Sequence, residues 1–120
     1  MYEDDDDDRL EAALRLAEDD PIRGAEALRS IVADHGVDPD IRFEAAAQLA
    51  EIDENRGAEA LHSIVADQGV DQDTRLEAAA QLAEIDEARG AEALRIIVGD
   101  HGVDPDTRSE AAARLAEIGG

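Results

Sequence analysis

The sequence predicts an all-α fold, an α-solenoid of stacked two-helix repeats. Aromatic residues make up only 2% of the 120 residues while alanine is plentiful, and this composition suits close helix packing better than sheets. The segment Arg23–Leu28 returns unchanged at Arg56–Leu61 and Arg89–Leu94, so the repeat period is 33 residues. Within each copy, apolar residues recur at the three- and four-residue spacing of a helix.

The chain starts with an incomplete copy of the repeat. Asp4–Asp8 is a run of like charges, for which we expect a disordered arm. Arg9–Ala13 then matches Arg42–Ala46 at the repeat spacing, and Ser109 replaces the apolar residue of the other copies, as expected of a capping repeat. The predicted segments are an acidic arm at 1–8, a half repeat at 9–22, and full repeats at 23–55, 56–88 and 89–120, the last being the C-terminal cap.

Each full repeat is expected to contain a helix A followed by a helix B. In the second repeat, helix A should end at Gly69 with a left-handed C-cap, and Val70 should make the hydrophobic contact beyond it. Asp71 is then the N-cap of helix B. In the other two repeats, Pro39 and Pro105 take the first position of helix B, where the missing N–H costs nothing. Neither helix can bury its apolar stripe alone, so the repeats must stack.

These repeats resemble a known family. The run Asp40–Ile52, followed by Ala60–Leu61 and Ile64–Asp67, is similar to the short HEAT-like repeats of the PBS-lyase type, with their Asp-x-Arg, paired alanines, Leu and Ile. The resemblance covers nearly the whole chain after residue 8, although alanine-rich helix pairs also occur in tetratricopeptide arrays. It implies a scaffold or recognition module in which charges near the start of helix B form structural ladders between repeats. The ladder residues are Asp40, Arg42, Asp73, Arg75, Asp106 and Arg108.

The charge of the chain restricts its partners. With a net charge of −21, the chain is not expected to bind nucleic acid directly, because phosphate backbones favour Lys and Arg. A charge-steered partner should be basic. No apolar run approaches the roughly 20 residues of a membrane span, so we expect no membrane partner and a cytoplasmic location. In a salt-loving organism, however, the same acidity would only keep the protein soluble.

A carboxylate-rich strip on the helix B segments is the predicted partner-binding surface. Its glutamates recur seven residues apart, on the face of each helix that should be exposed. The strip consists of Glu44, Glu51, Glu77, Glu84, Glu110 and Glu117. Because solenoids bind extended partners along a continuous helical layer, we expect a scaffold that binds a basic protein or peptide. A solvated face without a partner is the alternative interpretation.

The residue pattern predicts no catalytic site, no metal site and no cofactor. The three serines have no evident base beside them. His35 and His101 are expected just before the end of helix A, where an imidazolium suits the helix dipole. The Asp-rich turns at 34–40 and 100–106 faintly resemble a calcium loop, but they lack its full length and its closing Glu. We therefore expect that the chain is not an enzyme.

Three further alternatives stay open at the level of the sequence. The acidic surface would also suit a mimic of nucleic-acid charge that occupies a DNA- or RNA-binding protein. The close match between the internal copies suits an engineered or trimmed repeat array without a ligand. Finally, Ile96 replaces Ser30 and Ser63 and would leave an apolar spot on the last helix A. This spot suits either a weak homo-oligomer formed through the last repeat or packing of Ile96 on the altered neighbouring helix.

Overall fold

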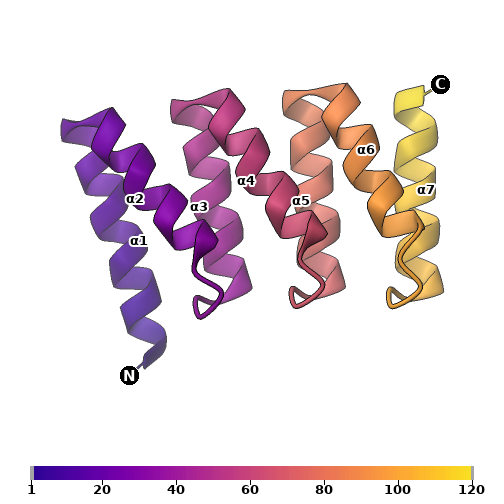
Figure 1. The fold of residues 1–120 in the computed structure, drawn as a ribbon, viewed down its shortest axis with the longest axis horizontal. Helices are drawn as coiled ribbons and strands as arrows, with labels where there is room; N and C mark the ends of the chain where they lie inside the picture. Colours follow the sequence, from indigo (N-terminus) through magenta and orange to yellow (C-terminus); the bar gives the residue numbers. More distant parts are fainter. Residues whose placement is uncertain (1, 120) are drawn as a thin grey trace. The chain divides into compact units, whose positions relative to one another are not determined.

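The computed structural model describes the backbone of residues 2–119 and the side chains of residues 5–118; Met1 and Gly120, the outer ends of the predicted arm and last repeat, lie outside it. Over the described backbone the chain forms seven α-helices and no strand, which confirms the all-α prediction (Figure 1). None of these helices is long and apolar enough to cross a membrane. The helices are α1 (Tyr2–Asp19), α2 (Pro21–Ala33), α3 (Pro39–Ile52), α4 (Glu54–Ala66), α5 (Gln72–Ile85), α6 (Glu87–Val98) and α7 (Pro105–Gly119).

The helices fall into two compact units, Met1–Ala60 and Leu61–Gly120, with the boundary inside α4. In the first unit, α2 packs against α1 and α3, and these two also contact each other. In the second unit, α6 packs in the same way against α5 and α7. Figure 1 shows α2 crossing in front of α1 and α3, and α6 crossing in front of α5 and α7. Each unit is therefore two layers of helices.

Aliphatic side chains at helical spacing form the core. Alanines such as Ala45, Ala46 and Ala79 are fully buried between them and allow neighbouring helices to approach closely. Burial of one Leu, Ile or Val side chain stabilises the fold by roughly 1.5–3 kcal/mol, so these positions dominate the packing energy. The largest fully buried side chains are Leu28, Ile31, Leu49, Leu61, Ile64, Val65, Leu82, Leu94 and Ile97.

A single aspartate joins each helix B to the next helix A. Asp53 ends α3 by donating its N–H to the carbonyl of Leu49 at 2.8 Å, and its carboxylate accepts the N–H of Arg56 in α4 at 3.2 Å. One residue therefore satisfies a carbonyl at the end of one helix and an N–H at the start of the next. Asp20 and Asp86 do the same between α1 and α2 and between α5 and α6.

A glycine allows each helix A to fold back onto the preceding helix B. A Cβ atom placed on Gly57 would lie 2.1 Å from the Cα of Ala50, and one on Gly90 would lie 2.3 Å from the Cα of Ala83. Real Cβ atoms do not come this close to backbone atoms, so any other side chain would push the two helices apart. Gly24 is under the same constraint. The glycine that follows the first arginine of every full repeat is therefore a packing requirement.

Helix A ends earlier than predicted. Helix α4 ends at Ala66, and no glycine in the described part of the chain has a positive φ, so the predicted left-handed C-cap at Gly69 is wrong. Instead, the carboxylate of Asp67 accepts the N–H of Gly69 at 2.9 Å, and its carbonyl accepts the N–H of Val70 at 3.0 Å. The aspartate builds the turn with its own side chain, which removes the need for a left-handed residue. Val70 is buried, as expected.

Helix B begins where predicted. Helix α5 starts at Gln72, and the carboxylate of Asp71 accepts the N–H of Thr74 at 3.1 Å. Pro39 and Pro105 are the first residues of α3 and α7. These starts were predictable because an Asp N-cap and a Pro at the first helical position act locally, whatever the rest of the fold does.

The acidic segment at the start of the chain is helical in the structure. Helix α1 begins at Tyr2, so residues 4–8 form its first turns. Carboxylates are favourable at this end of a helix because they interact with the positive end of its dipole. The carboxylate of Asp6 also accepts the N–H of Asp38, in the turn before α3, at 3.1 Å. The helix dipole and this contact both favour a helical conformation of this segment.

Gly90→Ala should destabilise the chain by roughly 1–3 kcal/mol, because the added methyl group overpacks the contact with Ala83. Urea denaturation monitored by circular dichroism measures the change. Gly99→Ala is the matched control, since a Cβ there would lie 3.4 Å from its nearest atom, which is an ordinary contact. Equal stability of the two variants would contradict the close approach of α5 and α6.

Candidate functional site

All six glutamates of the predicted strip are exposed in the structure. Two lie on α3 in the first unit, and the other four lie on α5 and α7 in the second unit. The exposed positions follow from the helical period, because residues seven apart return to the same face after two turns. The residues are Glu44, Glu51, Glu77, Glu84, Glu110 and Glu117.

A groove in the second unit brings two of these glutamates together. Glu84 on α5 and Glu117 on α7 both line it, and its volume is about 430 Å³. We call it the α5–α7 groove. Its other lining residues are Ala80, Ala83, Glu87, Leu94, Arg114 and Ile118. Carboxylates from three helices therefore share one concave surface with aliphatic side chains.

The chemistry of the α5–α7 groove suits a Lys or Arg side chain. Such a side chain has an aliphatic stem, which can lie against apolar atoms, and a charged end, which can pair with carboxylates. Arg114, which also lines the groove, forms an ion pair at 3.4 Å with Glu110, a carboxylate outside the groove lining. The described residues contain no group of three His, Cys, Asp or Glu side chains placed to hold a metal ion.

Glu87 is the groove residue that sequence reasoning missed. It lies in the first turn of α6, one residue after the Asp86 link. The predicted strip used helix B residues alone, because the sequence pattern does not show that a one-residue link keeps the start of helix A beside the end of helix B. The sequence signal for Glu87 is the pair Asp86-Glu87, which lies between the apolar stripe of helix B and that of the next helix A.

The arginines of the predicted ladder hold the ends of the A helices. The Nε of Arg75 donates to the carbonyl of Val65 at the end of α4, at 2.8 Å, and its Nη1 lies 3.0 Å from the carboxylate of Asp100. Arg42 and Arg108 donate through Nε in the same way, to the equivalent carbonyls at the ends of α2 and α6, at 2.9 and 3.0 Å. Arg42 and Arg75 are each only 4% exposed, so these contacts are made away from water.

The ladder aspartates have a different position. Asp40, Asp73 and Asp106 are exposed in the first turns of α3, α5 and α7, where their charge favours the helix start. The carboxylate beside Arg75 belongs instead to Asp100, in the turn after α6. The sequence signal for this pair is an Arg in one copy of the repeat and an Asp 25 residues later in the next copy.

Arg9 and Asp34 repeat this pairing in the first unit. Nη1 of Arg9 lies 2.8 Å from the carboxylate of Asp34. The hydrogen bond from Arg9 and the N–H of Gly36 lower the pKa of Asp34 below its usual value. The pKa of Asp100 is lowered as well, first by the N–H of Gly102 and then by the Arg partner.

The two histidines lie after the ends of the A helices, not just before them as predicted. Helix α2 ends at Ala33 and α6 ends at Val98, whereas His35 and His101 are exposed in the turns that follow. The reason is the early helix end described above, since the turn-building aspartate precedes each histidine. Their charge contributes only weakly to the lowered pKa of the neighbouring aspartates.

Fold and site together define an all-helical protein of consecutively packed helices with an acidic groove. In comparisons with known proteins, no family, no curated sequence and no solved structure matches the chain.

Asp100→Asn should remove a stabilisation that depends on pH. Because the pKa of Asp100 is lower in the folded chain than its ordinary 3.8, its ionised form stabilises the fold above that value, and the contribution is lost as the pH falls through the folded pKa. We expect wild type to melt higher than the variant at neutral pH, with the difference shrinking in acid. Glu92→Gln, at an exposed position, controls for the lost charge. A melting difference that is constant with pH would contradict the assignment.

Proposed function

We propose that this chain is a non-catalytic helical-repeat scaffold that binds a basic protein or peptide through its acidic surface. One observation carries the proposal: Glu84, Glu87 and Glu117 line a single groove together with aliphatic side chains. An isolated exposed carboxylate would contribute little to binding, whereas several around one basic side chain add to one another. The net charge of −21 would also speed the encounter with a basic partner.

We further propose that the copies stack in order as a HEAT-like α-solenoid with a period of 33 residues. The sequence repeat supports this, as do the recurring Arg contacts to the carbonyls of Val32, Val65 and Val98. In such an array the glutamates of successive B helices would continue the acidic surface beyond a single groove. An extended basic segment would then be a better ligand than a single side chain.

Binding to a basic probe tests the proposed function. The probe is a fluorescently labelled peptide of alternating Lys and Ala, titrated with the chain between about 0.1 M and 1 M salt, where the Debye length falls from about 10 Å to about 3 Å. The double variant Glu84→Gln with Glu117→Gln should lose about tenfold in affinity at low salt. This corresponds to about 0.7 kcal/mol for each of the two lost charge pairs, within the roughly 0.2–1 kcal/mol of exposed pairs. The loss should fade as salt is added.

The matched control removes two carboxylates elsewhere. Glu26→Gln with Glu92→Gln changes the net charge equally, at exposed positions on α2 and α6 outside the groove lining. This control should lose much less affinity than the groove variant. If both double variants lose the same affinity, binding follows net charge alone and the groove is not the site.

A further inference from the structure

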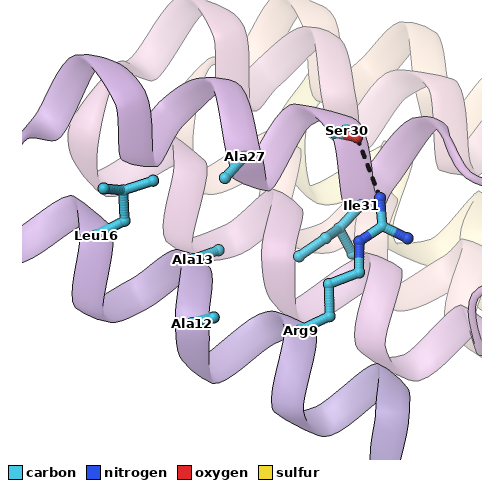
Figure 2. Close-up of a pocket in the computed structure, with 7 residues that line it drawn as sticks. All are labelled: Arg9, Ala12, Ala13, Leu16, Ala27, Ser30 and Ile31. Carbon is cyan, nitrogen blue, oxygen red and sulfur yellow. Dashed lines mark hydrogen bonds between the residues drawn. The ribbon is translucent and has the colours of Figure 1, made fainter.

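A second groove lies in the first unit, between α1 and α2, and differs from the acidic one in its chemistry. Figure 2 shows Leu16, Ala12 and Ala13 of α1 facing Ala27 and Ile31 of α2, with Arg9 at one end. Its volume is about 250 Å³, less than the 300–1,000 Å³ of typical small-molecule pockets. The lining is aliphatic apart from Arg9 and Ser30, whose side chains are hydrogen-bonded at 3.1 Å. We call this surface the α1–α2 groove.

In the next copy of the repeat, a helix covers the surface of α3 that is equivalent to this surface of α1. The counterparts of Ala12 and Leu16, one period later, are Ala45 and Leu49 of α3. Both counterparts are 0% exposed and α2 packs against α3, whereas Ala12 is exposed and Leu16 is 36% exposed. The α1–α2 groove therefore has the residues of an interface that elsewhere in the chain receives a helix.

Arg9 indicates the direction in which a helix would lie in the α1–α2 groove. Its counterparts Arg42 and Arg75 donate through Nε to a carbonyl in the last turn of the preceding helix A. The side chain of Arg75 is 5% exposed, while that of Arg9 is 39% exposed although its Asp34 pair is formed. By this correspondence, the last-turn carbonyls of a bound helix would lie over Arg9, where the negative end of the helix dipole meets a guanidinium.

We propose that the α1–α2 groove binds one amphipathic α-helix supplied by another molecule, with the C-terminal end of that helix at Arg9. Its apolar residues should have the spacing of Leu28, Ile31 and Val32, because these are the large buried side chains of α2, the helix that packs on α3. Recognition is by aliphatic burial, with the guanidinium setting the direction. This site and its ligand are independent of the acidic α5–α7 groove.

The test uses a peptide with the sequence of α2, Pro21–Ala33, amidated at its C-terminus. A hydrocarbon staple replaces Glu26 and Ser30, which are exposed in α2, because a free helix of this length is marginal in water. Fluorescence anisotropy measures its affinity for the full chain. Ala12→Gln should weaken binding at least about tenfold, because the longer side chain occupies the groove. Ala113→Gln, an exposed alanine of α7, should leave affinity unchanged.

Spin labels test the direction of the bound helix. A label at the C-terminus of the peptide should broaden the NMR signals of Arg9, and a label at its N-terminus should broaden those of Leu16. A peptide with Leu28→Asp and Ile31→Asp should not bind. Equal binding to wild type and Ala12→Gln, or broadening in the reverse order, would overturn the proposal. So would a dimer of the chain that Ala12→Gln dissociates without any peptide binding, since the groove would then belong to a second copy.

Discussion

The buried guanidinium of Arg75 is the contact on which the arrangement of the second unit depends. It joins the last turn of α4, through the carbonyl of Val65, to the turn after α6, through Asp100, while its own backbone belongs to α5. A buried charge is tolerated only when it is paired and hydrogen-bonded, so this contact specifies where all three segments must lie. Among the described residues, every buried side-chain nitrogen and oxygen has a hydrogen-bond partner. Arg42 and Arg108 make the equivalent contact with a preceding helix.

The one-residue links and the close glycine contacts complete this arrangement and lead to the candidate site. Because Asp86 alone separates α5 from α6, and Gly90 lets the two helices touch at Ala83, the start of α6 stays beside the end of α5. That proximity brings Glu87 to the groove that Glu84 lines. The acidic groove is thus a consequence of how tightly consecutive helices are joined.

Local chemistry explains which parts of this structure were predictable. Asp71 before α5 and Pro105 at the start of α7 define helix starts through contacts within a few residues, so the sequence was sufficient. Gly69 was misread because an aspartate two residues before a glycine suits both a left-handed cap and a side-chain turn, and the fold chooses between them. The exposed strip followed from periodicity. The pairing of Arg75 with Asp100 did not, since it joins residues 25 positions apart that only tertiary packing brings together.

The planar guanidinium of Arg75, and not merely its positive charge, holds these segments together. Equilibrium unfolding in urea tests it directly with Arg75→Lys and Arg75→Met, beside Arg95→Met as an exposed control. Loss of a hydrogen bond from a charged donor costs roughly 1.5–3 kcal/mol, and we expect both substitutions at Arg75 to lower the free energy of unfolding by about this amount. Lysine should not compensate, because one ammonium cannot contact both the carbonyl of Val65 and the carboxylate of Asp100 as the guanidinium does. The control should change stability by less than about 0.5 kcal/mol. If Arg75→Lys is as stable as wild type, the account is contradicted.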